Sequence, residues 1–180
     1  MVKNEEIYYS VHKRSDIDRF SEFEEVNTLS LKVHEYLQKN EIRQQIGKTH
    51  ALGASSHEIQ KIVKDFVLNL GFTSERKGLF AEYDVAGLRP DYFKKVGDSG
   101  ILFEVERGKT NANNMDLLDM WKTHICKQAH HLFLMVPVMR QTATNPKGTK
   151  IYMGVDKRIA SFFEDEENQI NVRSVSIFGY

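Results

Sequence analysis

The sequence predicts a mixed α/β fold, and three observations lead to this prediction. The first is an amphipathic helix that starts near residue 55 and ends at Gly71. The second is a group of strand-like segments after this helix, at 79–85, 91–96 and 101–107. The third is the segment 132–136, which is apolar at every position, as in a strand that is covered on both faces.

The element order gives the expected topology. The first helix has an apolar stripe at helical spacing, formed by Ile59, Ile62, Val63, Phe66, Val67 and Leu70. The turn sequence at 97–100 predicts a hairpin between the last two strands. Asn114 can cap a second helix that runs to about residue 127, with an expected buried stripe of Leu118, Trp121 and Ile125. The order helix, three strands, helix, strand therefore predicts a mixed sheet with helices on its faces.

The two ends of the chain are read as additions to this core. Residues 1–54 are expected to form an accessory helical layer, because Leu29, Val33 and Leu37 follow one another at intervals of four. Residues 55–138 are the expected core, and residues 139–180 are expected to add a strand near 151–154, a helix near 157–164 and a strand at 170–178. A chain of 180 residues with 41% hydrophobic content is expected to form a single domain.

Composition bounds the class of protein. The single cysteine, Cys126, excludes an internal disulfide and favours a reducing compartment, so we expect a cytoplasmic protein. The longest apolar run, 132–138, is far below the roughly 20 residues that a membrane helix needs. Lysine and arginine number 25 and so do the acidic residues, which disfavours a protein that simply coats DNA. A local basic stretch does occur, with Arg140, Lys147 and Lys150 and no acid among them.

Three acidic residues stand out in the predicted hairpin. If the turn is centred between Asp98 and Ser99, Asp91 lies opposite Glu106 and diagonal to Glu104, so that all three share one face. Glu104 and Glu106 would then be separated by roughly 6.6 Å along the strand. Carboxylates crowded on one face repel one another, and a hard cation such as Mg²⁺ relieves this repulsion. The alternative is a hairpin whose acids simply face solvent.

These residues resemble a known signature. Arg89-Pro90-Asp91 followed by Ile-Leu-Phe-Glu-Val-Glu at 101–106 is similar to the motif of the PD-(D/E)XK, or restriction-endonuclease-like, nucleases. The element order over residues 55–138 also resembles the αβββαβ core of that superfamily. The resemblance implies that Asp91 and Glu104 are ligands of Mg²⁺, or of Mn²⁺ in its place.

The sequence departs from the signature at the position of its lysine, which is Glu106 here. This E-x-E variant leaves two explanations open. A third carboxylate at Glu106 favours a second cation. A displaced lysine is the other option, and Lys122 and Lys109 are the candidates. Lys122 shares the expected inward stripe of its helix, although a lysine at the margin of a stripe also snorkels to solvent.

Glu58 allows two interpretations. The resemblance implies a metal ligand, because the first helix of that superfamily often lends an acid to the site. The sequence Ser55-Ser56-His57-Glu58 also fits a capping box, which accounts for the glutamate without any function.

The expected function is a magnesium-dependent endonuclease that hydrolyses DNA, of the restriction or defence type. Arg140, Lys147 and Lys150 would contact phosphates, and cleavage of both strands favours a homodimer. Two alternatives remain: a nuclease-fold subunit that binds DNA or protein without cutting, and an α/β interaction subunit whose acids are ordinary surface groups. The choice between DNA and RNA is left open by the sequence.

Overall fold

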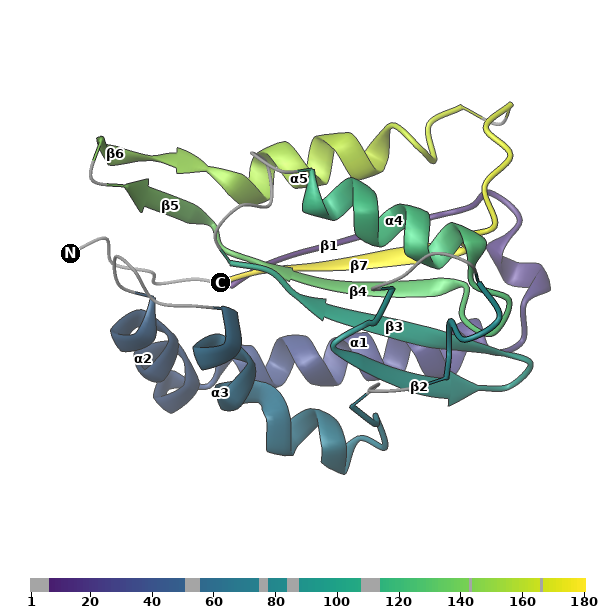
Figure 1. Ribbon diagram of the computed structural model, residues 1–180, viewed down its shortest axis with the longest axis horizontal. Helices are drawn as coiled ribbons and strands as arrows, with labels where there is room; N and C mark the ends of the chain where they lie inside the picture. Colours follow the sequence, from purple (N-terminus) through teal and green to yellow (C-terminus); the bar gives the residue numbers. More distant parts are fainter. Residues whose placement is uncertain are drawn as a thin grey trace.

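The computed structural model describes residues 7–50, 56–74, 78–83, 88–107, 114–142, 144–165 and 167–180. Its centre is a five-stranded sheet in the order β1-β7-β4-β3-β2 (Figure 1). The strands are β1 (Tyr8–Lys13), β2 (Tyr92–Val96), β3 (Ser99–Val105), β4 (His131–Val136) and β7 (Ser174–Gly179). Strands β3, β4 and β7 run parallel, and β1 and β2 pair antiparallel at the two edges. The predicted mixed α/β fold is confirmed.

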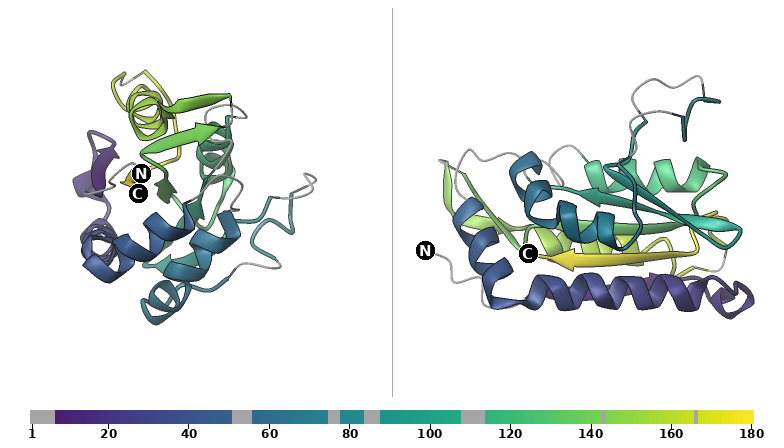
Figure 2. Two further views of the ribbon diagram at one scale, coloured as in Figure 1. Left: turned by 90° about the vertical axis from the view of Figure 1, so that its left-hand side faces the viewer. Right: turned by 90° about the horizontal axis from the view of Figure 1, so that it is seen from below.

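Helices cover both faces of this sheet. The helices α1 (Phe23–Gln38), α2 (Asn40–Thr49) and α3 (Ser56–Asn69) lie on one face, and α4 (Met115–Ile125) and α5 (Ile151–Ala160) lie on the other (Figures 1 and 2). Side chains of β3 alternate between the two layers: Ile101 and Phe103 pack with the first group of helices, and Leu102 packs with the second. By the same alternation Glu104 faces the layer of α4.

The helices at 23–38 and 56–69 agree with the sequence. Leu29, Val33 and Leu37 are all buried, as expected for the stripe of a packed helix. Strand β1 was not predicted, because its side chains are mostly half-buried and show no alternation of apolar and polar residues. Strands β1 and β7 lie in the same sheet as the central strands, so the sheet extends beyond the expected core of residues 55–138.

Two predicted strands are wrong. Residues 79–83 form turns, with hydrogen bonds from Ala81 N–H to Gly78 O and from Tyr83 N–H to Phe80 O, and residues 84–87 lie outside the described part of the chain. The position beside β2 is taken instead by a single bridge between Thr73 and Phe93.

The second wrong strand is the one expected at 151–154, and the error extends to the helix expected at 157–164. Residues 151–160 are the helix α5, in which Ile151, Val155 and Ile159 recur every four residues and are buried.

The hairpin is confirmed, but its register differs from the prediction by two residues. The turn is centred on Gly97 and Asp98, with Tyr92 opposite Phe103. One step beyond this pair, Asp91 stands opposite Glu104 and not opposite Glu106. Because side chains alternate with a period of two, a shift of two residues keeps the three acids on the same face.

The basic stretch expected as a loop is a second hairpin, formed by β5 (Met139–Thr142) and β6 (Asn145–Lys150). It follows β4 after two residues, so it leaves the sheet at the end where the parallel strand β3 also finishes (Figure 1). No helix in the described ranges is long and apolar enough to span a bilayer.

Candidate active site

Asp91 and Glu104 are joined by hydrogen bonds where the central hairpin opens. The backbone N–H of Asp91 donates to Glu104 Oε2 at 3.1 Å, and Asp91 Oδ2 accepts from the backbone N–H of Val105 at 2.8 Å. The two side chains thus replace the next backbone bonds of the β-ladder. The side chain of Gln60, from α3, lies close enough to Asp91 to lower the pKa of its carboxyl, although burial raises that pKa overall. These contacts fix the first carboxylate between two strands and a helix.

Helix α4 places a lysine and a further acidic residue beside Glu104. Lys122 Nζ forms an ion pair with Glu104 Oε1 and lies 2.8 Å from Asp119 Oδ1, one helical turn away. The side chains of Lys122, Glu104 and Asp119 are 7%, 5% and 0% exposed. Such burial of charged groups is stable only when they are paired, so the lysine is an integral part of this cluster.

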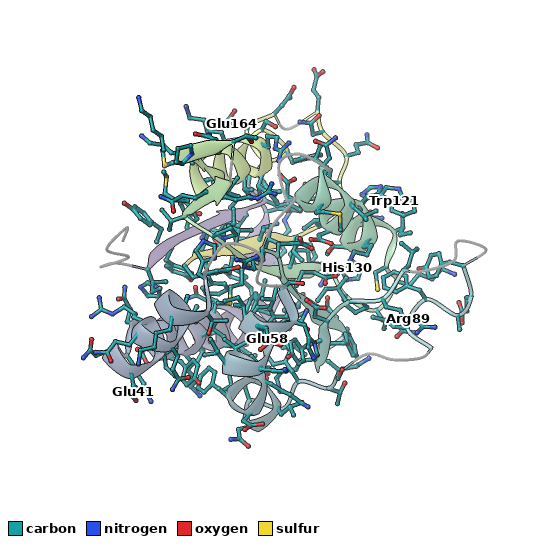
Figure 3. All side chains as sticks on the ribbon, turned by 60° about the vertical axis from the view of Figure 1, so that its left-hand side comes forward. Glu41, Glu58, Arg89, Trp121, His130 and Glu164 are labelled. Atoms are coloured by element: carbon teal, nitrogen blue, oxygen red, sulfur yellow. The ribbon has the colours of Figure 1, made fainter. Side chains whose placement is uncertain are left out.

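The orientation of α4 differs from the one predicted, although Ile125, the third residue of the expected stripe, is partly buried. Leu118 and Trp121, expected in the buried stripe, are 40% and 41% exposed, and Trp121 lies on the outer side of the helix (Figure 3). The buried face instead carries Asp116, Asp119, Met120, Lys122 and Thr123. Lys122 does point inward, but its neighbours there are acids and not the apolar residues expected. The helix turns its charged stripe toward the sheet because Glu104 supplies a partner for the lysine.

Asp116 ties α4 to α5. Arg158 donates to Asp116 Oδ1 at 2.7 Å and to Asn114 Oδ1 at 3.1 Å, and Asp116 is fully buried. Asn114, predicted as a cap, has a positive φ of 52° and makes no capping hydrogen bond with its side chain. The arginine therefore neutralises one buried acid of the helix from outside the Lys122 cluster.

Glu106 lies just past the end of β3, and its backbone is held on both sides. Its N–H donates to Met135 O at 2.8 Å, and its carbonyl accepts from the Tyr180 hydroxyl at 2.8 Å. Its side chain is half-buried. Burial, and then the negative charge of Asp119, raise the pKa of Glu106 to about 7.

The electrostatics of the cluster are dominated by burial and by excess negative charge. Burial raises the pKa of Asp119 to about 6, and burial together with Asp119 raises that of Glu104 well above its usual range. Burial alone would lower the pKa of Lys122, but Glu104 and Asp119 outweigh it and raise the pKa. The lysine is therefore an ammonium ion, and one positive charge faces several carboxylates.

The donor set fits a hard divalent cation. Asp91, Glu104 and Glu106 offer carboxylate oxygens, the ligands that Mg²⁺ prefers. Both carboxylate oxygens of Asp119 are buried without a well-formed hydrogen bond from the described residues, although Oδ1 lies close to Lys122. Within the described ranges no three Asp, Glu, His or Cys side chains are arranged as a ready-made metal site. In the arrangement seen here, the ammonium of Lys122 contacts two of the carboxylates.

The other predicted site residues that the structure describes make no contact with this cluster. Glu58 is exposed on α3 and pairs with Lys61 at 2.8 Å, and no contact joins it to Asp91 among the described residues. Lys109 and Ser55, the first residue of the expected capping box, lie outside the described residues. Arg140, Lys147 and Lys150 lie on the β5–β6 hairpin.

From the sequence, Asp116 and Asp119 were considered only as residues that could line the mouth of a groove, and Gln60 was missed. The spacing of Asp116, Asp119 and Lys122 at intervals of three places them on one helical face, and this was the available signal. It was overlooked because the apolar stripe was taken to be the buried one. Gln60 has no such signal, since it is a lone polar residue beside an apolar stripe.

Comparison with solved structures finds a likeness to a restriction endonuclease. No family model matches the sequence, and no curated protein is detectably similar to it. The fold is similar to that of the restriction endonuclease BglII in complex with a DNA 16-mer. That similarity has a TM-score of 0.49 and 10% sequence identity, and it covers 97% of this chain and 77% of the other.

Proposed function

We propose that this chain is a divalent-metal-dependent nuclease that hydrolyses phosphodiester bonds of DNA. The observation that carries the proposal is the buried contact of Glu104 with both Asp91 and Lys122. Two carboxylates and one lysine are also the residues of the PD-(D/E)XK signature, which this site resembles. In this chain the carboxylates come from adjacent strands and the lysine from a helix. Here the lysine comes from α4, which makes Lys122 the counterpart of the residue that Glu106 replaces.

In this proposal Asp91 and Glu104 hold Mg²⁺ or Mn²⁺, with Glu106 as a further oxygen donor. When bound, the ion supplies positive charge that polarises the scissile phosphate and lowers the pKa of an attacking water. Val105 N–H holds Asp91 in place through its hydrogen bond, and Gln60 lies beside the same carboxyl. We leave Glu58 out of this ligand set, because it pairs with Lys61 at the surface.

The basic β5–β6 hairpin is the proposed contact with nucleic acid. Lys147 and Lys150 are exposed and Arg140 is half-buried. The hairpin leaves the sheet at the end where Glu104 and Glu106 lie, so a phosphate backbone held there passes the carboxylates. Cleavage of both strands of a duplex needs two such sites, and we therefore propose a homodimer, to be tested by sedimentation.

Incubation with supercoiled plasmid tests the function. We expect cleavage in Mg²⁺ or Mn²⁺ and none in EDTA, with linear product, nicked circle and ladder distinguishing the mode of cutting. Glu104→Gln should reduce the rate roughly 1,000-fold, because metal-derived charge stabilisation is worth several kcal/mol and each 1.4 kcal/mol is a factor of ten. Glu58→Gln is the matched control and should cut like the wild type. A parallel assay on single-stranded RNA shows whether the protein prefers DNA or RNA as its substrate.

If folded wild-type protein cuts nothing in either metal, hydrolysis is contradicted. The arrangement of Lys122 among the carboxylates would then favour a nuclease-fold subunit that binds without cutting. A shift of labelled duplex DNA in a gel, lost when Arg140, Lys147 and Lys150 are replaced together by alanine, would identify that subunit as a DNA binder.

A further inference from the structure

The cluster around Lys122 holds more carboxyl groups than the lysine can pair with. The carboxyl groups of Asp91, Glu104 and Asp119 all interact with its ammonium group, which pairs directly with the last two. Arg158 does not contribute, because it is engaged with Asp116 and Asn114.

Both carboxylate oxygens of Glu104 already have a partner in this arrangement. Its Oε1 contacts Lys122, and its Oε2 accepts from the N–H of Asp91. A divalent cation at Oε1 would repel the ammonium of Lys122 on the same oxygen, and this repulsion favours displacement of the lysine. Moving a buried ammonium is costly unless a second anion receives it.

Asp119 meets the requirement for this second anion. It lies three residues before Lys122 on α4, is fully buried, and has its Oδ1 at 2.8 Å from the ammonium. Neither of its oxygens has a well-formed hydrogen bond within the described residues, so it retains acceptor capacity for the lysine.

We propose that Lys122 is a built-in cation that occupies Glu104 until a divalent ion displaces it, and that Asp119 is the positioning residue that receives the displaced ammonium. This inference rests on the proposed function, since it concerns the same metal site. It makes Asp119 act through Lys122 and not as a direct ligand. The lysine and the metal then compete for one oxygen atom, and Asp119 sets the balance between them.

Magnesium binding in four proteins tests this competition, measured by calorimetry and by the fluorescence of Trp121, the sole tryptophan of the chain. Lys122→Met should bind Mg²⁺ about tenfold more tightly than the wild type, because the competitor is gone and couplings between sites are typically of this size. Asp119→Asn should bind about fivefold more weakly, because the lysine then stays on Glu104. In the double variant the effect of Asp119→Asn should disappear.

Asp116→Asn is the matched control for loss of a distant negative charge, since Asp116 is buried on the same helix but pairs with Arg158. Asp116→Asn should change the affinity for Mg²⁺ by the same small factor in the wild type and in Lys122→Met. An equal loss of affinity from Asp119→Asn in both backgrounds, beyond that of the control, would make Asp119 a direct ligand and overturn the proposal. If neither the wild type nor Lys122→Met binds Mg²⁺, the proposed function fails as well.

A measurement on the wild type covers the case in which Lys122→Met does not fold. A buried ammonium exchanges its protons slowly, so the ¹⁵Nζ signal of Lys122 can be followed by NMR while Mg²⁺ is added. The signal should shift with a saturable dependence on Mg²⁺, and that of the exposed Lys61 should not. Saturable Mg²⁺ binding that leaves the Lys122 signal unmoved would contradict displacement while leaving the metal site standing.

Discussion

The ammonium group of Lys122, on α4, contacts the carboxylate of Glu104, on β3, with both side chains almost fully buried. This contact joins the helical layer to the sheet at the candidate active site. Removal of one partner leaves the other charge buried without compensation, which is costlier than the pair is worth.

Lys122→Met should therefore destabilise the protein by about 3–5 kcal/mol in the absence of metal, measured by urea denaturation at pH 7. Adding Glu104→Gln to this variant should restore part of the loss, because it removes the orphaned negative charge. If the single variant were as stable as the wild type, the lysine would not be the counter-ion that the structure indicates.

His131 should make the stability of the folded protein depend on pH. It is fully buried at the start of β4, where its Nε2–H donates to Glu22 at 3.3 Å and its Nδ1 accepts from the Ser174 hydroxyl at 2.8 Å. Burial lowers the pKa of His131 to about 4, from 6.5 in the unfolded chain. Between these pH values the unfolded chain binds a proton that the folded protein refuses. Stability should thus fall as pH drops from about 7 to 4, by roughly 3 kcal/mol from this residue.

His131→Gln tests this origin, because the amide keeps a donor and an acceptor but takes up no proton. Denaturation curves at pH 5 and pH 7 should lie closer together for the variant than for the wild type. The same separation in both proteins would assign the acid sensitivity to other groups, Glu22 among them.

Glu106 should make stability depend on pH in the opposite direction. Its pKa rises to about 7 in the folded protein, from the usual 4.5, chiefly because of burial. The folded state then binds the extra proton between pH 4.5 and 7, so this residue's contribution to stability is lost as pH rises through that window. Glu106→Gln should be more stable than the wild type at pH 8 and should gain less at pH 5. Thermal melts at the two pH values measure this, and an equal gain at both would contradict the shift.

Gly97 holds the register of the hairpin. Its φ of +54° is left-handed, and a Cβ there would lie 3.2 Å from Glu22 Cβ. Gly97→Ala should cost about 1–2 kcal/mol, the penalty of that conformation for an L-residue. Gly47→Ala is the control, since Gly47 lies in α2 with open space around it and should gain helix propensity. Equal stability changes in the two variants would show that the turn tolerates a side chain.

Much of the fold could be predicted from the sequence, because the spacing of apolar residues indicates which positions are buried. The stripe from Ile59 to Val67 gave α3, and the turn residues before Ser99 gave the central hairpin. Strand β1 was not readable, because an edge strand with half-buried side chains has no alternating pattern. At α5, Ile151 and Tyr152 suggested a strand, whereas the buried spacing of Ile151, Val155 and Ile159 is helical.

The candidate site was readable in part. Its two acids were placed on one face of the sheet because that conclusion survives a register shift of two residues. The facing of α4 was not readable, because two stripes compete on this helix. Apolar Leu118 and Trp121 would normally be buried, but the contact of Lys122 with Glu104 and Asp119 selects the charged stripe. Such a choice depends on partners distant in sequence, which spacing within one helix does not reveal.

The most direct test of the account is a crystal structure after soaking in Mn²⁺, read from anomalous scattering. We predict an anomalous peak bound by carboxylate oxygens of Asp91 and Glu104, with the ammonium of Lys122 withdrawn from Glu104 toward Asp119. A crystal saturated with Mn²⁺ in which Lys122 still contacts Glu104 and no peak lies beside the two acids would contradict it.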